Sequence, residues 1–188
     1  MNLLFLGSKS FFRTAMALAD ECGLGCVGAI DDVEVGPGIL GTLDQVAISH
    51  PTGAYAVVIA IGYNDLAARW AAIQKVKAKG YATPALIHPQ ALVAPSARIG
   101  DGALIMRGAI VDVAVTIGSF AVVWPGACVN HDSVVGANTF LSPNAVVCGN
   151  AQIGAHCFIG ANATVVDGAR LADGTRLNMH TGYTRRSK

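Results

Sequence analysis

The chain has 188 residues, enough for one large or two small domains, and its 13 Lys and Arg nearly balance its 12 Asp and Glu. This balance, with no basic run before the terminal segment 185–188, argues against nucleic acid as the main partner. No apolar stretch is long enough to span a membrane, and five unpatterned cysteines fit a reducing compartment, so we expect a cytoplasmic protein.

Residues 1–88 predict a small α/β domain. Three apolar segments are typical of buried strands: residues 3–6, 26–30 and 55–61. Two longer stretches predict helices: residues 11–22 and 66–79. Strands that alternate with helices form a parallel sheet, and ligands of such sheets bind beyond the carboxyl ends of the strands. We therefore expect ligand contacts after each strand, at residues 7–10, 31–32 and 62–64.

Two of these segments carry polar groups that suit a nucleotide. Gly7-Ser8-Lys9-Ser10 opens a helix, where backbone N–H groups attract anions. A single glycine is not a dinucleotide fingerprint, so this turn alone is weak evidence for phosphate binding. Asp31-Asp32 can accept hydrogen bonds from ribose hydroxyls or a base, or can be a solvated turn.

The second half of the chain has a strict six-residue period. From Ala91 to His180 it divides into fifteen six-residue words with no insertion; the first letter is small or β-branched, and the third is aliphatic. The sixth letter is most often Gly, Asn or Asp, which tolerate positive φ at a corner. Neither a helix nor a flat strand repeats every six residues, whereas a hexapeptide β-helix does. We expect inward first and third letters and about five coils of three words each, over residues 89–188.

His131 and Asp132 are the candidate catalytic pair. His131 is the fifth letter of the word ACVNHD, beside a corner, where its side chain can project outward. A neighbouring carboxylate fixes the imidazole tautomer and supports the imidazolium, as a general base requires. The same two residues also fit a surface histidine next to an ordinary corner residue.

The other histidines suggest structural roles. His156 and His180 are corner residues, and His50 and His88 lie beside prolines in connecting segments. Some hexapeptide β-helices resemble gamma-class carbonic anhydrases, which bring three histidines around zinc, two of them close in sequence. Here the three histidines of the repeats are each more than twenty residues apart. We therefore expect no metal site.

The segments LLFLGS, AIDD, VIAIGYND, VNHDSVVG and CFIGANATV are similar, over nearly the full length, to bacterial sugar acyltransferases of the NeuD/PglD type. The resemblance implies a Rossmann-like sugar-nucleotide-binding domain at 1–88 and a left-handed parallel β-helix at 89–188. It implies an acetyl-CoA-dependent N-acetyltransferase that acts on a nucleotide-linked amino-deoxysugar and assembles as a homotrimer.

The resemblance also implies roles for individual residues. The general base falls on His131, and its acidic partner on Asp132. The nucleotide sugar would contact the first turn, the acidic pair and the third strand end: Gly7, Ser8, Lys9, Ser10, Phe11, Asp31, Asp32 and Gly62. Acetyl-CoA would lie along the β-helix between two subunits, near Phe140, Gly149, Ala161 and Met179.

The chain departs from the family pattern at two places. The family's first turn reads G-x-x-G-H-G, whereas here Gly7 is followed by Ser8-Lys9-Ser10-Phe11-Phe12, whose larger side chains would crowd a phosphate although Lys9 offers charge. Phe140 stands where the family has a histidine that holds the acetyl carbonyl, so that contact would fall to backbone N–H groups, or the acyl group differs. Two alternatives stay open: an O-acetyltransferase of a sugar such as sialic acid, and a non-catalytic β-helix that binds a nucleotide sugar or scaffolds other enzymes.

Four large apolar side chains lie outside the inward positions: Val113, Phe120, Trp124 and Phe140. Exposed apolar faces of this kind mark interfaces. A three-sided prism suits threefold packing with closed symmetry, so the sequence predicts that these residues lie on an exposed face of a trimer.

Overall fold

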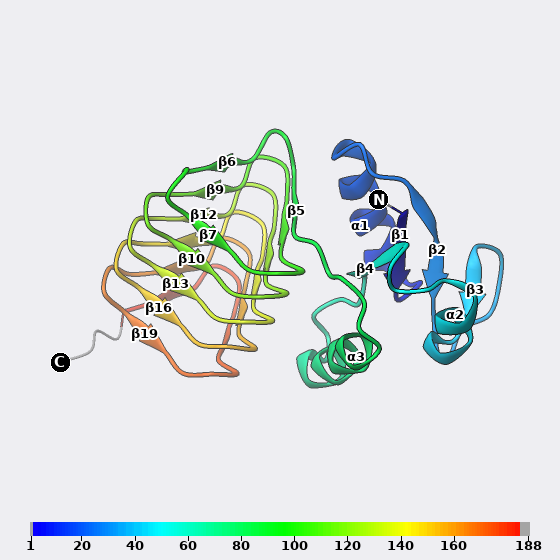
Figure 1. Cartoon of the computed structure of the whole chain (residues 1–188). Coiled ribbons are helices and arrows are strands. Elements are labelled where there is room, and N and C mark those ends of the chain that lie inside the picture. The colour runs from blue at the N-terminus through cyan, green and yellow to red at the C-terminus, as the bar shows by residue number, and fades with distance from the viewer. Residues whose placement is uncertain (1, 185–188) are drawn as a thin grey trace. The chain divides into compact units, whose positions relative to one another are not determined.

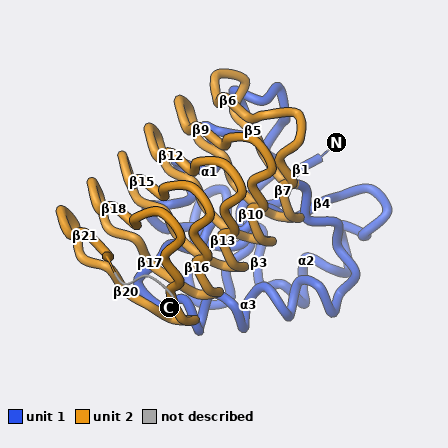
Figure 2. The backbone as a smooth tube through the Cα atoms, turned by 90° about the vertical axis from the view of Figure 1, so that its left-hand side faces the viewer, with its two compact units in different colours: residues 1–84 blue, residues 85–188 orange. Residues whose placement is uncertain are grey.

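Figure 1 shows the computed structural model of the chain, which describes residues 2–184, so the basic segment 185–188 lies outside the described residues. The chain divides into two compact units, residues 1–84 and 85–188 (Figure 2). The predicted fold class is confirmed, because a small α/β unit precedes a parallel β-helix with sheets of five, six and six strands. Among residues 2–184, no helix has both the length and the apolar character to cross a membrane.

The first unit is a parallel sheet in the order β3-β2-β1-β4. Its elements are β1 (Asn2–Leu6), α1 (Ser10–Glu21), β2 (Cys26–Ile30), β3 (Ile39–Gly41), α2 (Leu43–Ser49), β4 (Tyr55–Ile59) and α3 (Leu66–Ala78). The predicted strands and helices are present with small shifts at their ends, but β3 and α2 were not predicted. A capping box between Thr42 and Gln45 starts α2, a signal that is legible in the sequence.

The core of this unit fixes the turn that follows β1. Leu3, Leu4 and Phe5 are completely buried. Gly7 has a φ of 106°, and a Cβ built there would lie 2.9 Å from the carbonyl oxygen of Ala60, so only glycine fits between the ends of β1 and β4. The turn therefore leaves the sheet in one defined direction.

The second unit consists of three parallel sheets, each named here after its first strand. The β5 sheet contains β5 (Leu86–Ile87), β8 (Leu104–Ile105), β11 (Val122–Val123), β14 (Phe140–Leu141), β17 (Phe158–Ile159) and β20 (Arg176–Leu177). The β6 sheet contains β6 (Leu92–Val93), β9 (Ile110–Val111), β12 (Cys128–Val129), β15 (Val146–Val147), β18 (Thr164–Val165) and β21 (Gly182–Tyr183). The β7 sheet contains β7 (Arg98–Ile99), β10 (Thr116–Ile117), β13 (Val134–Val135), β16 (Gln152–Ile153) and β19 (Arg170–Leu171).

The register confirms a coil of three six-residue words. Cys128 pairs with Val146 and Val129 with Val147, one coil further along the chain. First- and third-position side chains fill the interior; Ala127 and Val129, for example, are completely buried. Polar first-position residues satisfy their groups inside: the Thr139 hydroxyl donates to the carbonyl of Gly154 and accepts from the N–H of Cys157. This explains why a hydroxyl is tolerated in an apolar core.

The sixth position turns the chain at every corner, as predicted. Every sixth-position residue from Gly102 to His180 has a positive φ, including Ala114 at 58° and Phe120 at 60°. The conformation is therefore imposed by the coil, and it holds even where the residue has no local preference for it.

The β-helix starts earlier than predicted. The word ALIHPQ at 85–90, which we assigned to a connecting segment, forms β5, and β5 pairs with β8 in the regular register. At the other end, β21 lies beyond His180 and pairs with β18. The third letter is apolar in both of these words, Ile87 in the first and Tyr183 in the last. Extending the six-residue period by one word at each end would therefore have predicted both strands.

The expectation of an exposed face was wrong for two of the four large residues. Phe140 and Phe120 are both buried, with at most 1% of their surface exposed. A Cβ at Gly102 would collide with the ring of Phe120, so this ring lies over the glycine of the preceding coil. Val113 is exposed, whereas Trp124 is half-buried. The burial of Phe140 also leaves its ring no exposed surface with which to contact a cofactor.

Candidate active site

His131 lies at the corner between the β6 and β7 sheets. It follows β12 in the fifth position of its word, as predicted, and 53% of its side chain is exposed. The same position in the neighbouring coils is held by Val113, Gly149 and Asp167. Fifth-position side chains of successive coils therefore form one column along this corner.

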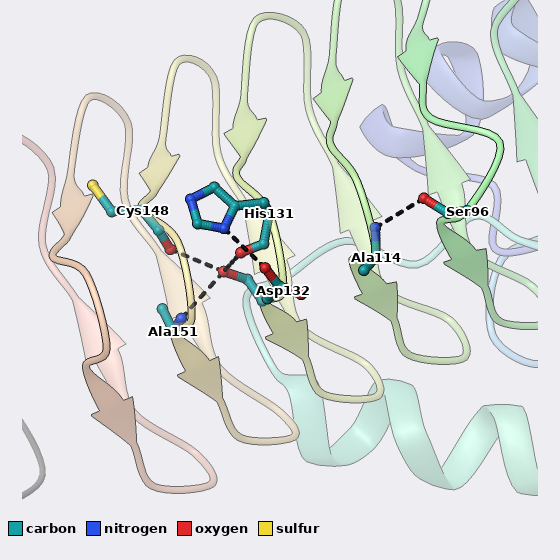
Figure 3. Close-up of polar contacts among 7 residues, drawn as sticks. Ser96, Ala114, His131, Asp132, Cys148 and Ala151 are labelled. Atoms are coloured by element: carbon teal, nitrogen blue, oxygen red, sulfur yellow. Dashed lines mark hydrogen bonds and ion pairs between the residues drawn. The ribbon is translucent and has the colours of Figure 1, made fainter.

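A hydrogen bond joins His131 to Asp132, with 3.0 Å between Nδ1 and Oδ2 (Figure 3). Asp132 has a φ of 58°, which aspartate tolerates, and its backbone N–H donates to the carbonyl of Val113 at 3.0 Å. The carboxylate thus binds one ring nitrogen, and Nε2 remains as the atom that can take a proton from a substrate.

The charges around His131 favour its protonated form. The hydrogen bond that Nδ1 of His131 donates to Asp132 raises the pKa of His131 most, desolvation lowers it, and the negative charges of Asp132, Asp112 and Asp167 raise it further. A base of raised pKa accepts a proton more readily.

Hydrogen bonds between coils hold this corner in place. The buried Ser133 hydroxyl donates to the carbonyl of Cys148 at 2.9 Å and accepts from the N–H of Ala151 at 3.2 Å (Figure 3). The N–H of Asn150 donates to the carbonyl of His131 at 3.0 Å. The backbone on both sides of the imidazole is therefore tied to the next coil.

The structure brings only one of the predicted acetyl-CoA residues beside His131. A Cβ on Gly149 would lie 2.6 Å from two atoms of the imidazole ring, so this glycine is in contact with the ring. Ala161 and Met179 occupy the fifth position at the corner between the β5 and β6 sheets, where the N–H of His180 donates to the carbonyl of Ala161. Within one chain these two residues belong to a different corner from His131 and Asp132.

In the first unit, Asp31 binds the turn after β1. It accepts from the Ser8 N–H at 3.1 Å, from the Ser8 hydroxyl at 2.6 Å, and from the N–H groups of Val33 and Glu34 at 3.0 Å each. Desolvation raises the pKa of the Asp31 carboxyl, but these four hydrogen bonds outweigh it and hold the pKa below its ordinary value. Asp31 is therefore an anion that joins two strand ends.

Asp32 is not part of the same cluster. Its Oδ1 accepts from the N–H of Leu43 at 2.9 Å, and its Oδ2 lies 3.6 Å from Nζ of Lys75. The two adjacent carboxylates thus serve different elements, so the predicted acidic pair does not act as a unit.

A cavity of about 390 Å³ opens between the turn after β1 and the loop from β2 to β3. Ser8, Lys9 and Phe12 line one part of it, and Glu34, Val35 and Pro37 line another. Nζ of Lys9 forms an ion pair of 3.0 Å with Glu34 at its rim. Glu34, Val35 and Pro37 were not predicted as site residues, although the loop VEVGPG after Asp32 was their visible signal.

The other predicted residues of the first unit's turns do not line this cavity. Gly7 fixes the turn after β1, and Ser10 is the exposed first residue of α1. Phe11 is buried, and a Cβ on Gly62 would lie 3.8 Å from its Cβ, so the two pack together. Phe12, which was not predicted, is the aromatic residue that lines the cavity. In the described part of the chain, no three His, Cys, Asp or Glu side chains gather closely enough to hold a metal ion.

The repeats and the fold are similar to those of known transferases. Residues 132–167 match the family "Bacterial transferase hexapeptide (six repeats)". A comparison with curated proteins gives no match. The acetyltransferase domain of PglB from Neisseria gonorrhoeae is 26% identical, with a TM-score of 0.91 over 100% of this chain and 93% of that one.

Two further structures share the fold. A mutant of the GDP-perosamine N-acetyltransferase from Caulobacter crescentus, in complex with CoA and GDP-perosamine, is 24% identical, with a TM-score of 0.90 over 99% of this chain and 90% of that one. WeeI from Acinetobacter baumannii is 18% identical, with a TM-score of 0.63 over 99% and 93% of the two chains. The matched repeats, the fold and the similarity to the PglB acetyltransferase domain show that this chain is an acyltransferase with hexapeptide repeats, similar to known sugar acetyltransferases.

Proposed function

We propose that this enzyme transfers the acetyl group of acetyl-CoA to the amine of a nucleotide-linked amino-deoxysugar, with His131 as the general base. The observation that carries the proposal is the pairing of His131 Nδ1 with Asp132, which leaves Nε2 to accept a proton at an exposed corner of the β-helix. The similar structures that contain CoA and GDP-perosamine support the choice of both substrates.

The geometry supports a direct transfer. Nε2 of His131 would remove a proton from the amine as its nitrogen attacks the thioester carbonyl, and Asp132 would stabilise the imidazolium. The carbon–sulfur bond then breaks, the acetyl group remains on the nitrogen as an amide, and CoA leaves as the thiol with the proton.

The chain offers a backbone donor for the negative charge that develops on the carbonyl oxygen. Gly149 lies against the imidazole, and its N–H donates no hydrogen bond within residues 2–184. In the equivalent position of another corner, the N–H of Ala155 is occupied by Asp173 at 2.8 Å. We propose the Gly149 N–H as an oxyanion donor, which replaces the histidine that the family has at the position of Phe140.

The cavity of the first unit is the proposed site for the nucleotide. The N–H groups that open α1 and the ammonium of Lys9 attract a diphosphate, while Asp31 holds the turn that presents them. The apolar side chains of Val35 and Pro37 can pack against a base. The enzyme would act as a homotrimer in the cytoplasm, with acetyl-CoA bound between subunits.

The decisive experiment is a screen of GDP- and UDP-linked 4-amino-4,6-dideoxyhexoses with acetyl-CoA, in which released thiol is measured and the product is identified by mass. Thiol release that depends on the amino group, and that is lost in His131→Ala, is the expected result. Transfer only to sugars that carry a hydroxyl in place of the amine would establish the O-acetyltransferase instead. Tight nucleotide-sugar binding without any turnover would leave a non-catalytic binding protein.

A further inference from the structure

Gly149 differs in burial from all the other fifth-position residues of the repeat. Among the fifth-position residues of the words from Ala91 to His180, all of which the structure describes, it alone is buried. The imidazole of His131 accounts for this burial, because a Cβ built on Gly149 would lie 2.6 Å from Cε1, 2.6 Å from Nε2 and 3.2 Å from Nδ1. The ring therefore lies in the space where a side chain would be.

The backbone itself does not require glycine at this position. Gly149 is not among the residues with positive φ, in contrast to the sixth-position residue that follows it. Ala137, Ala155 and Ala161 occupy the fifth position of other words with a Cβ in place. The demand for glycine at 149 thus arises from the histidine one coil before it.

We infer that Gly149 is a positioning residue for His131: by lacking a side chain, it lets the imidazole rest on the next coil with Nδ1 within hydrogen-bonding distance of Asp132. The inference rests on the proposed function, in which this imidazole is the general base. The two coils are joined here, since the Ser133 hydroxyl donates to the carbonyl of Cys148 and accepts from the N–H of Ala151.

A methyl group at position 149 would displace the ring. The imidazole can rotate about its own side-chain bonds, so it would swing away while the backbone of the coil stays in place. Asp132 would keep its position, because its N–H is bound to the carbonyl of Val113. The displaced ring would lose its hydrogen bond to Asp132, and its distances to the charges of Asp112 and Asp167 would also change.

The test is Gly149→Ala, with Gly182→Ala as the matched control, because a Cβ on Gly182 would meet no atom within 4 Å. The pKa of His131 is measured by NMR from the pH titration of its Hε1 signal. In Gly149→Ala we expect this pKa to fall, and kcat to fall at least about ten-fold, since small misplacements of a catalytic group cost this much or more. In Gly182→Ala both should match the wild type.

An unchanged pKa of His131 in Gly149→Ala would overturn the inference, even if kcat fell, because the loss would then lie in acetyl-CoA binding or oxyanion stabilisation. A second measurement is a thermal double-mutant cycle. Gly149→Ala should lower Tm in the wild type but not in a His131→Ala background, where the ring is absent. Equal losses in both backgrounds would show that the backbone needs glycine. Neither measurement requires a sugar substrate, so both remain decisive if the proposed acetyl transfer is not observed.

Discussion

Ser8 donates two hydrogen bonds to one carboxylate oxygen of Asp31, from its backbone N–H at 3.1 Å and from its hydroxyl at 2.6 Å. The second oxygen of Asp31 accepts from the N–H groups of Val33 and Glu34. One side chain therefore orders the turn after β1 and the loop after β2, which together line the cavity of the first unit.

This arrangement separates the roles of two adjacent aspartates. Asp31→Ala should raise KM for the nucleotide sugar about ten-fold, the scale of lost hydrogen bonds to a charged group, with kcat little changed. Asp32→Ala serves as the comparison and should leave KM nearly unchanged, because Asp32 binds Leu43 and Lys75 instead. Steady-state kinetics at saturating acetyl-CoA distinguish the two. A lowered kcat with unchanged KM in Asp31→Ala would contradict the assignment.

Removal of the proposed base should abolish most of the turnover. His131→Ala is expected to lower kcat by about 10²-fold or more, the usual contribution of a general base, while acetyl-CoA binding measured by calorimetry stays close to wild type. Asp132→Asn should cost less, because the imidazole remains. His156→Asn is the control, since asparagine accepts the positive φ of that corner. Near-normal turnover in His131→Ala would exclude it as the base.

The pH profile should report the His131–Asp132 bond. A general base works when neutral, so kcat/KM should fall as the pH drops through the pKa of His131. Asp132 raises this pKa above the ordinary value, which places the acidic limb of the wild-type profile at higher pH than a free histidine would give. In Asp132→Asn the limb should move to lower pH. A limb that stays in place would show that another group titrates.

Much of the fold follows from the period of the sequence. The first, third and sixth letters predict the core and the corners, and the same period places residue 149 one coil beyond His131. That Gly149 lies next to His131 was therefore available from the sequence once the coil length was used, whereas its contact with the imidazole ring required the structure. The short β3 and α2 were missed because three- and seven-residue elements give little periodic signal.

What could not be predicted depends on packing between segments far apart in the chain. Phe120 and Phe140 are outside the inward positions, yet both are buried. Asp31 and Asp32 are adjacent in the sequence, yet they bind different segments. Asp31 accepts from the N–H groups of Val33 and Glu34. Asp32 accepts from the N–H of Leu43. Letter patterns identify which residues are polar, but they do not determine which partners those residues find.

Replacing Ala114 by glycine should stabilise the protein. Ala114 has a φ of 58°, which costs an L-residue about 1–2 kcal/mol, and its N–H donates to the Ser96 hydroxyl. Ala114→Gly keeps this hydrogen bond and removes the strain, so thermal unfolding should shift to higher temperature. Ala155→Gly is the matched control, because Ala155 does not have positive φ, and it should lower Tm. A lower Tm in Ala114→Gly would contradict this account of the corner.

The apolar residues that can support assembly differ from the predicted ones. Phe120 and Phe140 are buried, but Leu92 and Ile110 expose 66% and 39% of their surface on the β6 sheet, and Val113 exposes 55% in the column of His131. An apolar face beside the corner that carries His131 is suited to a second subunit.

We therefore expect a homotrimer whose mass by light scattering is three times 19.3 kDa, with Ile110→Glu shifting it toward the monomer and lowering activity. Gln152→Glu adds the same charge to an exposed position on the β7 sheet and should change neither mass nor activity. If Ile110→Glu lowers both the oligomer's mass and the activity, the result would support a site shared between subunits. A fully active wild-type monomer of 19.3 kDa would refute both the trimer and the shared site.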